Sequence, residues 1–151
     1  MPESLLRLRV SMPDSKIVNE PVLLLLKSGL SRDPRMQLTD DPEAPMLVVS
    51  GEHTDTQTLS VGSTGRVNGY LLKYEITYAL KGPRGEPWIE SRAVKLMRDY
   101  SFDPLSVLAK EQEEQELKRV MQRDAVQQIL RKLSRVSVPP AQPPGQAPAQ
   151  P

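Results

Sequence analysis

Apolar and polar residues alternate most regularly between Tyr70 and Leu80. All six even-numbered positions of this stretch are apolar, whereas lysine, glutamate and threonine occur among the odd-numbered ones. A period of two is typical of a β-strand that buries one face. A shorter alternation runs from Leu5 to Val10, where arginines occupy alternate positions. We therefore predict a strand at each of these places.

Two more strands are expected beside the Tyr70–Leu80 strand. Met46–Val49 is a short apolar run, and the threonine-rich segment Glu52–Val61 should continue it as an exposed ribbon. After the Tyr70–Leu80 strand, a further strand is expected from Trp88 to about Phe102. Its alternation slips around Ala93–Val94, which indicates a β-bulge.

Glycines mark the turns between these strands. The segments Gly62–Gly65 and Gly82–Gly85 each lie between two strand patterns, so both are expected to be hairpin turns. A glycine-rich phosphate loop would instead follow a strand and open a helix. Neither segment therefore indicates a nucleotide site.

Two helices are predicted. In the first, Asn19 can cap the N-terminus, Pro21 suits the first turn, and the apolar run that follows should end at Gly29. The second should begin at Asp103-Pro104, a typical helix start. It carries an apolar stripe at steps of three and four residues, formed by Leu117, Met121, Ala125, Ile129, Leu133 and Val136.

The predicted order of elements is β-α-β-β-β-α. This order favours an α+β fold, a four-stranded sheet with two helices packed on one face. The domain should cover residues 1–138. Residues 139–151 contain only proline, alanine, glutamine and glycine, so we expect them to form a disordered tail.

Composition narrows the functions that this fold can carry. The 151 residues include 20 lysines and arginines and 19 acidic residues, a net charge of +1, so any contact with a polyanion must be local. The absence of cysteine excludes disulfides, thiolate catalysis and cysteine-based zinc sites. The longest apolar run, Val22–Leu26, has five residues, against roughly 20 for a bilayer span.

We expect no enzyme and neither a metal nor a cofactor site. His53 and Asp55 share one face of an exposed strand and enclose no pocket, which favours a surface histidine over half of a catalytic triad. Glu52 and Asp55 lack the spacing of a calcium loop.

Two kinds of binding module remain open. Arg92, Lys95 and Arg98, with Tyr100, could form a nucleic-acid surface, but the near-neutral charge and the lack of a motif favour a solvated face. The second kind would bind an anionic amphiphile. A lysine such as Lys110 can hold a phosphate as a point charge while its stem and apolar neighbours cover an acyl chain.

The C-terminal half resembles a known family. Arg98–Glu113, with its Asp-Pro break and the segment Leu108-Ala109-Lys110, and Arg123–Leu133 both resemble the LPS-assembly lipoprotein family LptE. The Pro-Glu-Ser start, the predicted helix end at Gly29 and the Tyr70 strand follow in matching order.

The resemblance implies a concrete function. Members have a four-stranded sheet packed by two helices and are lipid-anchored at the periplasmic face of the Gram-negative outer membrane. They plug the lumen of the β-barrel LptD, bind lipopolysaccharide, assist assembly of the barrel, and insert lipopolysaccharide into the outer leaflet. The alternative is a general periplasmic interaction module, or a nucleic-acid-binding domain, without a ligand role.

The resemblance also implies two site residues. The ligand-contacting lysine of the family falls in the Leu-Ala-Lys segment, which makes Lys110 the first candidate. The second basic residue lies in the turn before the tyrosine strand, where Arg66 is the nearest arginine and Ser63 stands at the apparently equivalent place. The family has a secretory leader and an acylated cysteine. This chain shows neither, so we expect a soluble form of the domain without its anchor.

Overall fold

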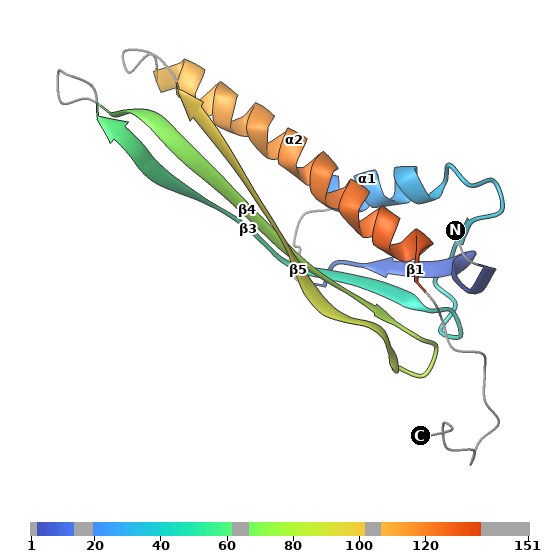
Figure 1. The fold of residues 1–151 in the computed structure, drawn as a ribbon. Helices are drawn as coiled ribbons and strands as arrows, with labels where there is room; N and C mark the ends of the chain where they lie inside the picture. Colours follow the sequence, from blue (N-terminus) through green and yellow to red (C-terminus); the bar gives the residue numbers. More distant parts are fainter. Residues whose placement is uncertain (1–2, 14–19, 62–66, 102–106, 137–151) are drawn as a thin grey trace.

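The computed structural model describes residues 3–13, 20–61, 67–101 and 107–136. Its elements form a long twisted sheet with two helices beside it (Figure 1). In chain order they are a 3-10 helix (Glu3–Leu5), β1 (Arg7–Ser11), α1 (Pro21–Leu30), β2 (Gln37–Leu38), β3 (Met46–Val61), β4 (Val67–Lys81), β5 (Pro87–Ser101) and α2 (Val107–Ser134).

The sheet is mixed, with the strand order β2-β1-β3-β4-β5. β1 is parallel to both β2 and β3, whereas β3, β4 and β5 form an antiparallel meander. The predicted α+β class and the order of the main elements are confirmed. The sheet has a fifth strand, β2, inside the polar segment that follows α1. Only two residues long, it is held by backbone hydrogen bonds that leave no hydrophobic pattern in the sequence.

The core lies between one face of the sheet and the two helices (Figure 1). The even-numbered residues of β4 from Leu72 to Leu80 are buried there. α2 lays its predicted apolar stripe over the sheet, and Met121, Ile129 and Leu133 are fully buried. Since no described helix covers the other face, that face remains open (Figure 1).

α1 ends one residue later than predicted, at Leu30, and Ser31 is its C-cap. The expected stop at Gly29 is wrong, because Gly29 lies inside the helix and has no positive φ. Its role is one of space: a Cβ at this position would overlap the side chain of Leu130 in α2. The helix begins after Glu20, with Pro21 in its first turn as predicted, while the expected cap Asn19 lies outside the described residues.

A β-bulge in β3 changes which side chains of the strand face the core. Ser50 pairs with Thr77 and His53 with Glu75, so Gly51 and Glu52 together oppose a single residue of β4. Gly51 takes a left-handed backbone conformation, with φ of 65°, which suits the first residue of such a bulge. Odd-numbered side chains face the core before the bulge, and even-numbered ones face the helices after it.

The bulge predicted in β5 is displaced. β5 pairs regularly with β4 through Ala93 and Val94, and the register shifts between Ile89 and Arg92 instead. The extra residue brings Ile89 and Val94, which differ in parity, to the same buried face. The irregular alternation at Ala93–Val94 thus reflects a bulge that lies a few residues earlier in the strand.

Several predicted features lie outside the described residues. They are the turn at residues 62–65, the helix start at Asp103-Pro104 and the tail at residues 139–151. The turn at Gly82–Gly85 is confirmed, with Gly85 at a φ of 81°. Within the described ranges, no helix combines the length and the apolar character that crossing a membrane requires.

The bulge yields a stability prediction. A Cβ at Gly51 would meet only Thr77 at an ordinary distance of 3.7 Å, so the cost of substitution comes from the backbone. Gly51→Val should lower the free energy of unfolding by about 1–3 kcal/mol in urea denaturation. Gly51→Asn should lose less, since asparagine tolerates this conformation. Equal losses for both variants, or no loss, would contradict the role given to the left-handed conformation.

Candidate functional site

Lys110 lies in the first turns of α2. This end of α2 lies over the end of the sheet that is distant from α1 (Figure 1). Its Nζ is 4.8 Å from the centroid of the Tyr70 ring in β4. The same atom is 3.9 Å from Oε1 of Glu114, one helical turn further on. A cation over a tyrosine ring is held by the negative face of the ring. Lys110 therefore has a defined position and still has 35% of its side chain exposed.

The tyrosine beneath Lys110 is part of a stacked pair. Tyr70 and Tyr100 are direct partners across β4 and β5, and their ring centroids are 5.4 Å apart at an interplanar angle of 20°. The Tyr100 hydroxyl donates a hydrogen bond to Oε1 of Glu114, at 2.5 Å. Burial, followed by this hydrogen bond, raises the pKa of Tyr100 above its ordinary value. We call Tyr70, Tyr100, Lys110 and Glu114 the lysine cluster.

The lysine cluster is suited to binding an anion. The carboxylate of Glu114 is shared between a phenol and an ammonium group, which fixes both. The ammonium group is a point charge at the rim of an aromatic surface, so it can meet a phosphate while apolar atoms lie beside it. Of the two expected site residues, the structure places Lys110 in this cluster, and Arg66 lies outside the described residues.

A second polar group, which sequence analysis missed, joins β3, β4 and α2. Oε2 of Glu52 accepts hydrogen bonds from the hydroxyl of Tyr74, at 2.6 Å, and from Nε2 of Gln122, at 2.8 Å. Tyr74 and Gln122 are buried. We call these three residues the inner triad. Because the bulge at Gly51 turns Glu52 inward, the expectation that Glu52 belongs to an exposed ribbon is wrong, although the threonines after it are exposed.

The open face of the sheet carries alternating charges. One row across the strands is His53, Glu75 and Lys95, and the next is Asp55, Lys73 and Met97. Nε2 of His53 is 3.6 Å from Oε2 of Glu75. His53 is thus a surface histidine, as predicted, and the sheet pairing brings it beside a glutamate. Glu52 and Asp55 lie on opposite faces of the sheet, so they do not form a cation site together.

The structure divides the basic residues that could have formed a nucleic-acid surface. Arg98 lies on the helix face, where its Nη2 is 2.8 Å from Oδ2 of Asp124. Tyr100 is buried in the lysine cluster. Lys95 lies on the open face opposite Glu75. The described residues therefore do not bring these side chains together as one basic and aromatic surface.

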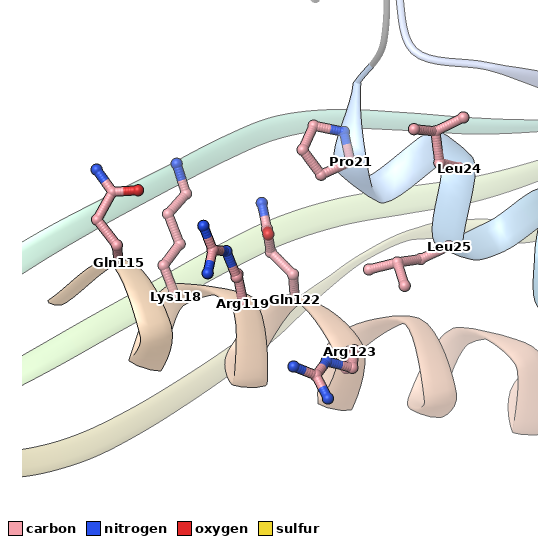
Figure 2. Close-up of a pocket in the computed structure, with 8 residues that line it drawn as sticks. All are labelled: Pro21, Leu24, Leu25, Gln115, Lys118, Arg119, Gln122 and Arg123. Carbon is pink, nitrogen blue, oxygen red and sulfur yellow. The ribbon is translucent and has the colours of Figure 1, made fainter. Parts of the chain in front are cut away.

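An open groove separates α1 from α2 (Figure 2). Pro21, Leu24 and Leu25 come from α1, and the opposite wall is a polar and basic stretch of α2. The residues from α2 that line the groove are Gln115, Lys118, Arg119, Gln122 and Arg123. The volume of the groove is about 500 Å³.

These features define a small α+β domain, with a fixed surface cation, an open charged sheet face and a groove between its helices. The LptE model, described as lipopolysaccharide-assembly, matches residues 8–133. The chain belongs to the LptE family of lipopolysaccharide-assembly lipoproteins. The predicted resemblance is thereby confirmed.

Solved structures of lipoproteins share the fold. Rare lipoprotein B from Shewanella oneidensis is 27% identical, with a TM-score of 0.71 over 85% of this chain and 93% of that one. A minor lipoprotein from Acinetobacter baumannii is also 27% identical, with a TM-score of 0.71 over 92% and 98%. Lipoprotein B from Nitrosomonas europaea is 26% identical, with a TM-score of 0.70 over 85% and 81%. No curated protein matches the chain.

The inner triad yields a prediction for alkaline pH. Burial, followed by the hydrogen bond to Glu52, raises the pKa of Tyr74 well above its ordinary value of about 10. The unfolded chain therefore releases the Tyr74 proton near pH 10 and the folded chain does not, so the contribution to stability is complete below about pH 10 and declines above it. Tyr74→Phe should flatten this decline between about pH 10 and 12 in guanidinium denaturation. An unchanged slope would contradict the assignment.

Proposed function

We propose that this protein binds lipopolysaccharide and plugs the lumen of the outer-membrane β-barrel LptD. There it assists assembly of the barrel and insertion of lipopolysaccharide into the outer leaflet. Family membership supports the general role. The single observation that carries the ligand role is the position of Lys110, with Nζ 4.8 Å from the centroid of the Tyr70 ring.

Lipopolysaccharide offers phosphates beside acyl chains, and the lysine cluster offers the complementary chemistry. The Lys110 ammonium group is paired with the carboxylate of Glu114, at 3.9 Å. A phosphate monoester carries roughly −1.5 to −2 charges, so it competes well for the ammonium group against one carboxylate. The phenol of Tyr100 keeps Glu114 in place during that exchange. The cluster would thus pair with one phosphate while the tyrosine stack supports the stem of Lys110.

The open sheet face would meet the wall of the barrel. Its rows combine both signs of charge with threonine and glutamine, and the interior of outer-membrane barrels is polar. A sheet face of this composition can form hydrogen bonds and ion pairs with such a wall without burying an apolar core. A lipid anchor would hold the domain at the periplasmic face of the outer membrane.

The ligand role is tested by reversing the charge at Lys110. Lys110→Glu should lower the affinity for lipopolysaccharide about tenfold, because it replaces one charge-assisted contact by a repulsion at a partly exposed site. Lys110→Glu combined with Arg66→Glu should lower it further. Binding is measured with immobilised lipopolysaccharide, and the thermal unfolding midpoint of each variant is measured in parallel.

Lys95→Glu is the matched control, since it makes the same charge change on the open face. It should leave the affinity for lipopolysaccharide unchanged. The ligand role is wrong if Lys110→Glu binds as well as the unaltered chain, or if Lys95→Glu weakens binding equally. A steep salt-dependent shift with oligonucleotides, absent with lipopolysaccharide, would favour a nucleic-acid binder instead.

The plug is tested by photo-cross-linking in cells that make LptD. A photoreactive residue at Met97, a 60% exposed side chain on the open face, should cross-link to LptD. The same residue at Gln127, exposed on α2, should cross-link less. Both variants leave the core untouched, so expression and folding should match. A chain that is recovered without any cross-link to LptD from either position would contradict the plug.

A further inference from the structure

The groove between α1 and α2 lies apart from the lysine cluster. Figure 2 shows Leu24 and Leu25 on α1 and the basic side chains along α2, with the sheet behind them. The volume, about 500 Å³, falls within the range of about 300–1,000 Å³ that small-molecule sites occupy. The nearest of its basic residues, Lys118, follows Lys110 by eight positions, a distance along the helix of roughly 12 Å.

One wall of the groove is apolar and accessible. Leu24 is 54% exposed, although its neighbours in the sequence of α1 include the buried core residues Val22 and Leu26. Pro21 and Leu25 extend the same wall. Of the described large apolar side chains, only four are exposed, and Leu24 is the only one of the four that lies in α1.

The opposite wall is positively charged. It carries Lys118, Arg119 and Arg123, and the acid beside them is Glu116. Arg119 and Arg123 both approach this one carboxylate, at 3.3 and 4.0 Å. Lys118 forms no ion pair within the described part of the chain. These three side chains place cations opposite the leucines of α1, while the carboxylate of Glu52 lies beneath them at Gln122.

The floor of the groove is fixed by the inner triad. Gln122 lines the groove and is 4% exposed, and its Nε2 donates to Glu52. α2 is therefore tied to the bulge in β3 at the point where the groove opens. The hydrogen bonds of the inner triad therefore hold α2 in place without a ligand in the groove.

We propose that this groove is a second binding site, which takes the acyl chain and the phosphate of one anionic amphiphile. Leu24 and Leu25 contact the chain, while Lys118 and Arg119 pair with the phosphate. The identification of that amphiphile as lipopolysaccharide rests on the proposed function. The groove itself is tested with a simpler probe of the same chemistry.

The probe is dodecyl phosphate below its micelle concentration, added to the full chain. Dodecyl maltoside supplies an alkyl chain without the charge, and inorganic phosphate supplies the charge without the chain. Dodecyl phosphate should bind with the highest affinity and shift the methyl NMR signals of Leu24 and Leu25. The signals of Leu59, which is 51% exposed but lies on β3, should stay in place.

Two groove variants sharpen the test. Leu24→Ser and Lys118→Glu should each lower the affinity for dodecyl phosphate several-fold, and together roughly tenfold or more. Leu59→Ser and Lys95→Glu are the matched controls and should have no effect. All four changes are at exposed positions. If one variant is destabilised, the methyl signals of Leu24 and Leu25 in the unaltered chain still test whether dodecyl phosphate binds in the groove.

The outcomes separate this inference from the proposed function. The groove site is wrong if dodecyl phosphate leaves Leu24 and Leu25 unmoved, if dodecyl maltoside binds equally well, or if the control variants weaken binding as much. A loss of lipopolysaccharide binding in Lys110→Glu together with a silent groove would leave the proposed function intact. A responsive groove in a chain that fails to bind lipopolysaccharide would establish the amphiphile site and contradict the proposed function.

Discussion

The rest of the structure depends on the contact between the apolar stripe of α2 and the buried, even-numbered side chains of β4. Met121, Ile129 and Leu133 meet Tyr74 and Ile76 in one continuous core. Each side chain buried in this way contributes about 1.5–3 kcal/mol. The same contact sets the rotation of α2 about its axis. That rotation places Lys110 over Tyr70 near one end and turns Lys118 toward α1 further along.

Most of the architecture follows from patterns in the sequence. The alternation in β4 and the stripe in α2 are long enough to specify both the type of element and its buried face. The groove could not be found in this way, because its walls belong to helices that are nearly a hundred residues apart in sequence. The apolar run of α1 does not show which of its leucines is exposed, and only the crossing of the helices decides that Leu24 remains so.

The candidate site could be predicted only in part. Lys110 followed from a family resemblance and not from composition, since a lysine near leucines is common on any surface. Its support by stacked tyrosines depends on the register between β4 and β5, which no local pattern reveals. The inner triad was missed because one backbone angle at Gly51 changes the parity of the residues from Glu52 to Thr58 in β3. A glycine between an apolar run and a polar run was its only signal.

The topology of the sheet also bears on the order of folding. β3, β4 and β5 pair with their neighbours in sequence, whereas β1 joins β3 in parallel across the whole of α1 and β2. Closing that long connection costs entropy before its contacts form, so contacts between distant segments develop late. The apolar wall of the groove arrives with α1. A complete chain that folds would therefore form the meander and its charged rows before α1 brings the apolar wall of the groove into place.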